Sequence, residues 1–370
     1  MDTSDPGINF SNEGICDYCL NFDSNIGPIW KDSFGAAGRA RLMALASQIK
    51  ADRSPGASFD CIIGLSGGLD SSYAALVAIR DMGLRPLLVH VAAGWNTDQA
   101  VGNIEKLVDG LGAELYTDVG RWSSIKRMQL AFFKSGIADL DLVQDAVFFS
   151  SLYRFARIHK IKHVLTGSNF STECCREPEA WGGFLGIDKT LFDDIWRKCG
   201  DGEPIEFPIV DILKYKIFYQ KMLSIKVHHP LNYVPFVKSD AEDKLKNEFS
   251  WMPFKHKHHE SRFTRFYEDY WLPKRFGFDK RKAHFSSLIC TGQLSREAAL
   301  RRLQHPEMPR EFMAREVKYI AHKLGVSVEE LDVMMNAPRR TFLNYRSKRS
   351  VIRGASRLLR FLGVERRYFR

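Results

Sequence analysis

A glycine-paired loop, Ser66-Gly67-Gly68-Leu69-Asp70-Ser71-Ser72, follows the apolar run from Cys61 to Leu65. This order predicts a buried strand that turns through the loop into a helix beginning near Ser71. Two adjacent glycines allow φ > 0 and bring successive backbone N–H groups toward an anion, and the helix N-terminus adds the positive end of its dipole. We therefore expect a phosphate-binding loop in which Asp70 holds Mg²⁺ against polyphosphate oxygens.

Other interpretations of the loop stay open at this point. The residues from Gly64 to Gly68 also satisfy G-x-S-x-G, the nucleophile elbow of α/β-hydrolases. An elbow serine normally follows several strands, whereas the segment before Asp60 has no strand pattern and the run from Ala36 to Lys50 indicates a helix. The loop also lacks the lysine that ends a Walker A motif. An ordinary glycine-rich turn is the plain alternative.

The loop from Ser66 to Ser72 resembles the pyrophosphate loop of the N-type ATP pyrophosphatases. That group includes asparagine, argininosuccinate and NAD synthetases and several tRNA-modifying enzymes. The resemblance implies a sheet of the adenine-nucleotide alpha-hydrolase-like type. It also implies cleavage of ATP to AMP and pyrophosphate, with a substrate oxygen activated as an adenylate before a nucleophile displaces AMP.

The pattern after the loop alternates between helix and strand. The expected helices cover 71–82, 97–111, 123–133 and 142–159, and the expected strands cover 86–91, 113–117 and 162–166. Such alternation predicts an α/β fold with a doubly wound parallel sheet. Ligands bind beyond the carboxyl ends of the strands in such sheets. The phosphate loop, His90 and the turn Gly167-Ser168-Asn169 can therefore face one crevice.

From about residue 207 only helical periodicity is clear. We expect helices at 211–224, 260–271, 295–303, 310–324 and 327–335. These patterns predict four regions along the chain. They are a Cys-containing segment with a helix at 1–55, an ATP pyrophosphatase domain at 56–225, a helical substrate-binding region at 226–335 and a basic amphipathic tail at 336–370.

Cations and aromatic rings are interleaved from Lys255 to Phe266 and again from Phe276 to His284. Fixed cations suit a polyanionic substrate, and Arg262 and Arg281 can each bind a carboxylate or phosphate through two parallel hydrogen bonds. The rings can stack on a base or a sugar. A zinc site formed by the histidines of His256-Lys257-His258-His259 and a solvated basic loop are the alternatives.

The chain as far as about Leu303 resembles the N-acetyl sugar amidotransferase family of bacterial surface-polysaccharide (LPS O-antigen) and nonulosonic-acid pathways. Five motifs carry this resemblance: Gly94-Trp95-Asn96, Gly167-Ser168-Asn169-Phe170-Ser171-Thr172-Glu173, Lys257-His258-His259-Glu260-Ser261-Arg262, Phe276-Gly277-Phe278-Asp279-Lys280-Arg281 and Leu288-Ile289-Cys290-Thr291-Gly292-Gln293-Leu294-Ser295-Arg296-Glu297. The family reaction converts an acetamido group on a nucleotide-activated sugar into an acetamidino group, using ATP and ammonia.

The resemblance implies roles for particular residues. Asp70 would hold Mg²⁺, Lys280 and Arg281 would neutralise charge on the departing pyrophosphate, and Glu260 would accept a proton from the attacking ammonia. The expected ATP-binding residues are Ser66, Gly67, Gly68, Asp70, Ser71, Ser72, His90, Gly167 and Asn169. The expected substrate-binding residues are Trp95, Asn96, Glu173, His259 and Arg262.

The source of ammonia is expected to be another protein. A glutaminase needs a nucleophilic cysteine in a G-x-C-x-G elbow or at position 2, and none of the seven cysteines has either setting. The resemblance implies a separate glutaminase similar to the histidine-biosynthesis glutaminase, with its cyclase-like companion. Two other functions stay open. They are a tRNA-modifying ATP pyrophosphatase that uses Cys174-Cys175, and a non-catalytic nucleotide-binding scaffold.

A half zinc site lies near the N-terminus. The family usually has two Cys-x-x-Cys pairs there, which together suit tetrahedral zinc, but this sequence has only Cys16-Asp17-Tyr18-Cys19. The native chain could begin upstream, the pair could recruit ligands such as Cys174 and Cys175, or the site could be lost.

The basic charge of the chain is concentrated in its tail. Residues 336–370 contain eleven Lys and Arg and one Glu, which accounts for the whole net charge of +10. Six apolar residues there follow helical spacing: Val351, Ile352, Ala355, Leu358, Leu359 and Leu362. The arginines 353, 357, 360 and 366 lie largely off that stripe. Such a helix suits an anionic membrane face, a partner protein, RNA or simple packing on its own domain, and we expect nucleic acid to be an unlikely partner.

Cysteines without regular disulfide spacing indicate a reducing compartment. The sequence has neither a signal-peptide pattern nor an apolar run of 18 residues. We therefore expect a cytoplasmic protein, with possible association at the inner membrane face through the tail.

Overall fold

A parallel sheet forms the centre of the molecule. The computed structural model describes residues 1–182 and 188–361, with side chains as far as Ala355 at the C-terminal end. Five strands pair in parallel in the order β3-β2-β1-β4-β5. Their bounds are β1 Cys61–Gly64, β2 Pro86–Ala92, β3 Leu115–Val119, β4 His163–Leu165 and β5 Lys226–His228. The strand order reverses between β1 and β4, so the loop after β1 opens at the point where such sheets bind ligands.

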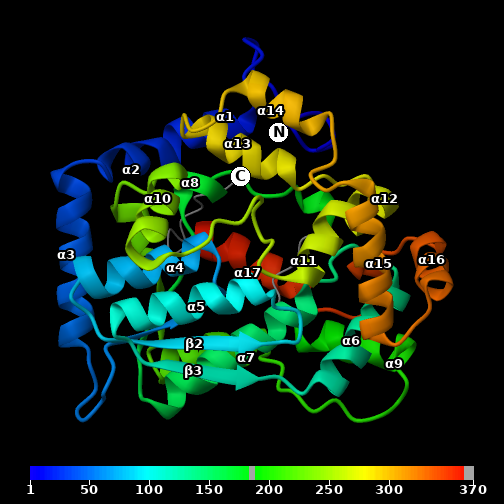
Figure 1. The fold of residues 1–370 in the computed structure, drawn as a ribbon, viewed down its shortest axis with the longest axis horizontal. Helices are drawn as coiled ribbons and strands as arrows, with labels where there is room; N and C mark the ends of the chain where they lie inside the picture. The colour runs from blue at the N-terminus through cyan, green and yellow to red at the C-terminus, as the bar shows by residue number, and fades with distance from the viewer. Residues whose placement is uncertain (183–187, 362–370) are drawn as a thin grey trace.

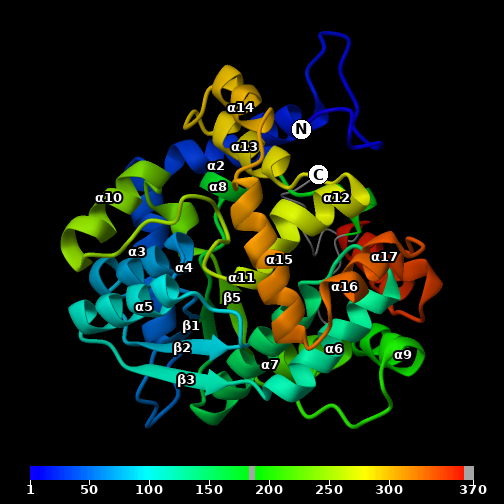
Figure 2. The ribbon, with the colours of Figure 1, turned by 45° about the vertical axis from the view of Figure 1, so that its right-hand side comes forward.

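Both faces of the sheet are covered by helices (Figures 1 and 2). In β1, Ile62 packs with α6 and α7 on one face, and Ile63 packs with α3, α4 and α5 on the other. Successive side chains of a strand point to opposite faces, so burial on both sides requires the continuous apolar run seen in the sequence. The covering helices are α3 Ala36–Ala51, α4 Leu69–Leu76, α5 Asp98–Leu111, α6 Trp122–Ser135 and α7 Leu142–Ile158.

The predicted fold class, a doubly wound parallel sheet followed by a mostly helical region, is confirmed. The helix after the phosphate loop begins at Leu69 rather than Ser71, which puts Asp70 in its first turn, and it continues as the π-helical turn Val77–Asp81. The fifth strand, β5, was not predicted. It has three residues, of which Lys226 is exposed, so it lacks the apolar run that marks the other buried strands.

Helices fill the rest of the molecule. At the N-terminal end they are α1 Asp17–Asn21 and α2 Gly27–Asp32, joined by the π-helical turn Phe22–Ile26. After the sheet they are α8 Phe170–Glu173, α9 Lys189–Cys199, the π-helical segment Lys214–Met222, α10 Lys238–Phe249, α11 Arg262–Phe266, the π-helical turn Tyr267–Trp271, α12 Leu272–Phe276, α13 Arg281–Cys290, α14 Arg296–Leu303, α15 Arg310–Leu324, α16 Val328–Asn336 and α17 Arg349–Phe361. Short 3₁₀ turns lie at Glu179–Trp181, Pro230–Tyr233 and Phe342–Asn344.

The C-terminal helices share their core with the sheet. The ring of Phe133 on α6 lies 4.6 Å from Trp271 and 6.0 Å from Phe263, centroid to centroid. All three rings are buried in the cluster that also contains Ile62 of β1. The region around α11 and α12 is therefore fixed against the carboxyl-end side of the sheet domain.

The start of the predicted basic tail packs on the chain itself. Tyr345 is buried, and its hydroxyl donates to the carbonyl of Ser135 at 2.6 Å. The Lys348 ammonium pairs with Asp211 at 2.7 Å. Val351, in the predicted apolar stripe, is 71% exposed. The side chains of Leu358, Leu359 and Leu362 lie outside the described residues. Among the described helices, none has both the length and the apolar character needed to span a bilayer.

We expect Tyr345→Ala to lower the free energy of unfolding by about 3 kcal/mol, because it removes a buried ring and a buried hydrogen bond. The neighbouring Leu343, which is 81% exposed, provides a matched control. Leu343→Ala should change stability by less than about 0.5 kcal/mol. Urea unfolding measures both values. Equal effects would mean that residues 337–348 do not pack on the domain as described.

Candidate functional site

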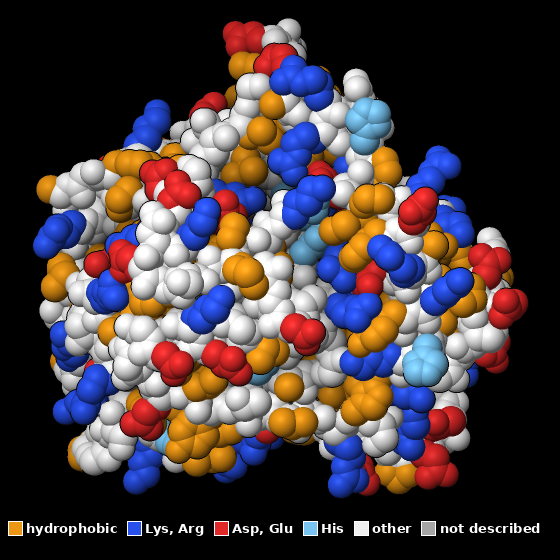
Figure 3. All heavy atoms as spheres, in the orientation of Figure 1, with side chains coloured by type: hydrophobic (Ala, Val, Ile, Leu, Met, Phe, Trp, Pro, Cys, Tyr) orange, Lys and Arg blue, Asp and Glu red, His pale blue; other side chains and the backbone are white. Residues whose placement is uncertain are grey.

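A pocket lies where the phosphate loop meets the C-terminal helices. Figure 3 shows Lys, Arg and His side chains gathered around a hollow in the upper middle of this face. The lining residues of the phosphate-loop side are Ser66, Gly68, Leu69, Asp70, Ser71 and Thr172. Those from the rest of the chain include Lys238, Trp251, His256, Lys257, His258, His259, Glu260, Glu268, Lys280, Arg281 and His284. Two motifs nearly two hundred residues apart in the sequence therefore form one cavity.

The phosphate loop is held in a conformation that requires glycine. Gly67 has φ of +81°, and a Cβ atom there would lie 2.4 Å from the carbonyl oxygen of Ala100. The carbonyl of Gly67 accepts hydrogen bonds from Trp251 Nε1 at 3.2 Å and Asn103 Nδ2 at 3.3 Å. Asn103 and Trp251 hold the Gly67 carbonyl in place, so the N–H groups of the loop keep one orientation without a ligand.

The loop hydroxyl groups bond to one another. The Oγ atoms of Ser66 and Ser71 are 3.1 Å apart, and the N–H of Gly68 donates to Ser66 Oγ at 3.2 Å. Ser72 is fully buried behind the loop and does not line the pocket. A Cβ atom on Gly167 would lie 2.6 Å from the backbone of Asp70, so the turn after β4 packs directly on the loop.

Glu260 lies against the phosphate loop. Ser66 Oγ donates to Glu260 Oε1 at 3.4 Å, and a Cβ atom on Gly68 would come within 2.7 Å of the same oxygen. Backbone pairing produces this approach. The N–H of Thr97 donates to the carbonyl of Glu260 at 3.0 Å, and the N–H of Arg262 donates to the carbonyl of Trp95 at 2.8 Å.

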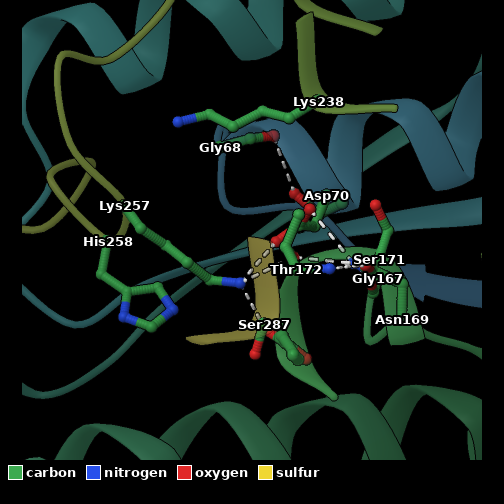
Figure 4. A network of polar contacts seen from close by, with 12 residues as sticks. Gly68, Asp70, Gly167, Asn169, Ser171, Thr172, Lys238, Lys257, His258 and Ser287 are labelled. Carbon is green, nitrogen blue, oxygen red and sulfur yellow. Dashed lines mark hydrogen bonds and ion pairs between the residues drawn. The ribbon is translucent and has the colours of Figure 1, made fainter. Parts of the chain in front are cut away.

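The ammonium of Lys257 lies between oxygen atoms of three residues (Figure 4). Its Nζ is 3.2 Å from Asp70 Oδ2, 2.8 Å from Glu173 Oε1 and 3.0 Å from Thr172 Oγ1. Asn169 Nδ2 donates to the other Asp70 oxygen at 3.2 Å. Three hard oxygen donors thus converge on one cationic group, and such a donor set fits Mg²⁺.

Electrostatics stabilise the charged forms of this cluster. Burial alone would raise the pKa of Glu173, but the positive charges of Lys257 and Arg176 lower it to about 2. Burial lowers the pKa of Lys257, yet Asp70 and Glu173 raise it above its ordinary value. Both groups are therefore ionised at neutral pH.

A second charged cluster adjoins the first through His258, which follows Lys257 in the chain. Glu268 Oε1 is 3.1 Å from Lys280 Nζ and 3.1 Å from His258 Nδ1. Burial opposes charge on His258, but Glu268 outweighs it and raises the pKa of His258 to about 9. The ring of His284 lies 5.2 Å from that of His258, and burial followed by repulsion from His258 lowers the pKa of His284 to about 3.

Arg281 and His259 line the pocket but have carboxylate partners of their own. Arg281 makes two hydrogen bonds to Asp279, at 2.9 Å from Nε and 2.7 Å from its terminal nitrogen. His259 Nε2 lies 3.0 Å from Asp269 Oδ2. In contrast to the zinc alternative, the neighbouring histidines have different partners, because His256 pairs with Glu307 at 2.6 Å. They do not converge on a common point within the described chain.

Nine expected ATP- and substrate-binding residues lie outside the pocket lining. Five of them belong to the phosphate loop or to the turn and helix beside it, namely Gly67, Ser72, Gly167, Asn169 and Glu173, and four lie elsewhere. Trp95 is only 1% exposed. Its Nε1 donates to Gln129 at 2.8 Å and its ring packs on Phe263, so the structure places Trp95 in the core and not at the expected substrate contact. Arg262 pairs with Glu316 and stacks on Tyr319 outside the pocket lining, and its expected contact with substrate stays a prediction. The remaining two bond to each other: Asn96 Nδ2 is 2.7 Å from His90 Nε2, and His90 Nδ1 is 2.9 Å from the carbonyl of Leu65.

Some pocket residues were not predicted as site residues. Lys257 and Thr172 were noted only as parts of motifs, and Glu268 and His284 only within a helix and an aromatic run. In the helix expected at 260–271, Glu268 follows Glu260 by eight residues, about two helical turns, a spacing that would bring both carboxylates to one side. This was the available signal for Glu268.

The N-terminal cysteines do not line this pocket. Cys16 and Cys19 lie with their sulfur atoms 3.5 Å apart, next to Cys290 of α13. Cys174 and Cys175, which follow α8, are buried in the same apolar cluster. None of the seven cysteines lines the pocket described above.

A comparison with known protein families finds a match for the C-terminal part of the chain, which contributes several residues to the pocket. Residues 260–359 match a family model described as the C-terminal domain of WbpG-like LPS biosynthesis proteins. The match begins at Glu260 and includes the motifs around Lys280 and Gly292, so the predicted resemblance is confirmed for this part of the chain. No curated protein sequence matches the chain.

Solved structures with similar folds include several nucleotide-using enzymes. The NH3-dependent NAD synthetase of Campylobacter jejuni is 15% identical with a TM-score of 0.35, covering 84% of this chain and 98% of that one. The NMN synthetase of Francisella tularensis is 20% identical with a TM-score of 0.28, covering 62% and 91%. The U34-tRNA thiolase NcsA of Methanococcus maripaludis is 14% identical with a TM-score of 0.29, covering 72% and 80%. Because these scores are below 0.5, we base the fold on the strand order itself.

We predict that the His258 ring titrates near pH 9 and that Glu268→Gln moves this midpoint toward 6.5, because the neighbouring negative charge is lost. NMR titration of the ring protons measures it. Glu307→Gln, which removes the carboxylate beside His256, is the matched control and should leave the midpoint unchanged. A His258 midpoint near 6.5 in the unmodified protein would contradict the described cluster.

The raised pKa of His258 also makes the stability of the fold depend on pH. The folded pKa of His258 lies above the unfolded value of 6.5, so its pairing with Glu268 stabilises the fold fully below pH 6.5. That contribution is lost as the pH rises through about 9.

Proposed function

We propose that this protein is an ATP-dependent amidotransferase that converts an acetamido group of a nucleotide-activated sugar into an acetamidino group. One observation carries the proposal. The phosphate loop and the cation-rich segment 256–284 line the same pocket. The family match of residues 260–359 to LPS biosynthesis proteins supports surface polysaccharide synthesis as the pathway class.

The chemistry needs an activated oxygen. An amide oxygen is a poor leaving group, so its attack on the α-phosphorus of ATP produces an adenylated imidate and releases pyrophosphate. Ammonia then adds to the imidate carbon, AMP leaves with the former amide oxygen, and the amidine remains. Such a route requires a polyphosphate site beside a site for a neutral amide.

The chain's own residues suit the first step. The N–H groups of the phosphate loop, together with Ser66 and Ser71, bind and orient the β- and γ-phosphates. Lys257 is ionised and lies at the same end of the pocket, so it offsets negative charge that grows on the pyrophosphate. Asp70, Glu173 and Thr172 would hold Mg²⁺, which would supply further charge neutralisation when bound.

The other residues suit the second step. Glu260 reaches the phosphate loop, so its carboxylate lies close to where the adenylate would form and can accept a proton from ammonia. Lys280 and protonated His258 add positive charge to the pocket wall, which suits the anionic nucleotide part of the sugar substrate. Arg281 adds a guanidinium on that wall, already oriented by Asp279.

Ammonia would come from a separate glutaminase, with a cyclase-like companion. No cysteine lines the described pocket, which supports external ammonia and disfavours a sulfur-transferring tRNA enzyme built on Cys174-Cys175. The basic helix at the C-terminus is a proposed contact with that partner or with an anionic membrane face in the cytoplasm.

Asp70→Asn and Ser66→Ala should each lower pyrophosphate release by about 100-fold or more, because each removes a group that stabilises the phosphate end of the pocket. A coupled phosphate assay with inorganic pyrophosphatase measures the rate. Asp193→Asn, an exposed carboxylate on α9 paired with Lys189, is the matched control and should keep the normal rate. Near-normal release by Asp70→Asn would refute the assignment of the loop.

The purified chain should convert its acetamido sugar with ATP and ammonium salts but not with glutamine alone. Incubation with amide-labelled glutamine, followed by mass spectrometry, shows whether nitrogen enters the product. We expect label only after a glutaminase is added. Labelled amidine formed by the chain alone would mean that one of its cysteines acts as a glutaminase nucleophile.

A further inference from the structure

Five of the seven cysteines meet at one place although they come from three distant segments. Cys16 and Cys19 flank the start of α1, Cys174 and Cys175 directly follow α8, and Cys290 ends α13. The sulfur atoms of the last three lie within 4.8 Å of one another. The thiol of Cys19 is hydrogen-bonded to that of Cys290, which joins the N-terminal pair to the other three. This cluster is separate from the pocket that binds the proposed substrates.

Two pairs of sulfur atoms have the spacing that a tetrahedral metal ion requires. A Zn–S bond of about 2.3 Å gives sulfur atoms about 3.8 Å apart along each edge of a tetrahedron. Here Cys16 and Cys19 are 3.5 Å apart, and Cys175 and Cys290 are 4.0 Å apart. Two opposite edges of a four-sulfur site are therefore already near the required length. No disulfide joins these cysteines, because all seven are free thiols.

The surroundings suit thiolate ligands. The Cys16 sulfur accepts hydrogen bonds from the backbone N–H groups of Tyr18 and Cys19, and such oriented N–H groups stabilise a metal-bound thiolate. Apolar side chains surround the cluster and limit access of water: Tyr18, Phe22, Ile26, Trp30 and Phe170. Cys174 belongs to the same cluster, but its thiol also has an acceptor outside it, the carbonyl oxygen of Ser287 at 3.7 Å.

We propose that Cys16, Cys19, Cys175 and Cys290 bind one structural zinc ion as thiolates. Binding releases the four thiol protons and involves no change of oxidation state. The ion joins the N-terminal segment to the end of α8 and to α13. Because α8 carries Thr172 and Glu173, two of the three oxygen donors around Lys257, the ion also positions one wall of the nucleotide pocket.

The test is metal analysis of the full chain purified under reducing conditions. Inductively coupled plasma mass spectrometry should find one zinc per chain, and titration with a mercurial reagent should release it. Replacement by Co²⁺ should give the intense visible bands of tetrahedral thiolate coordination, and removal of the metal should lower Tm by several degrees. A chain that contains no bound metal, or iron with acid-labile sulfide, would overturn the proposal.

Serine variants assign the ligands. Cys16→Ser, Cys19→Ser, Cys175→Ser and Cys290→Ser should each reduce zinc content at least tenfold. Cys174→Ser is the matched control within the cluster, and Cys61→Ser in β1 is the control outside it. Both controls should keep one zinc per chain. Loss of zinc in Cys174→Ser but not in Cys175→Ser would overturn the ligand set. If a variant does not fold, the Co²⁺ spectrum and mercurial release of the unmodified protein still decide the number of thiolates.

Discussion

The backbone pairing between residues 95–97 and 260–262 is the contact on which the site depends. An antiparallel bridge joins Asn96 to Ser261 and holds Glu260 against the phosphate loop. The buried rings of Trp95 and Phe263 lie directly beside this bridge, 5.2 Å apart. Without this contact, the phosphate loop and the charged side chains of the C-terminal region would not line one pocket.

Charge in the pocket is arranged in two adjoining clusters. Lys257 with Asp70 and Glu173 forms one, and Lys280 with Glu268 and His258 forms the other. Burying such ions is costly unless each has an opposite partner, and here the partners raise the pKa values of the cations and lower those of the acids. The clusters therefore keep fixed charge at neutral pH without rearrangement of the protein.

Local sequence patterns predicted most of the sheet and the phosphate loop. The strand-loop-helix order around Ser66 depends on neighbouring residues, so periodicity and paired glycines were sufficient to find it. Elements with a weak apolar pattern escaped prediction: β5 has three residues, and the 12-residue helix α10 buries only Ala241, Leu245 and Phe249, a stripe too narrow to recognise. Site residues whose position depends on distant contacts were the least predictable. Trp95 belongs to a shared motif, yet packing against Phe263 makes it a core residue.

The most direct measurement of the proposed reaction follows the amide oxygen. The acetamido sugar is labelled with ¹⁸O at its carbonyl, incubated with the protein, ATP and ammonium salt, and the nucleotide products are analysed by mass spectrometry. Transfer of the amide oxygen to the α-phosphorus predicts ¹⁸O in AMP and unlabelled pyrophosphate. Amidine formed together with unlabelled AMP, or with ¹⁸O in inorganic phosphate, would contradict the adenylate route.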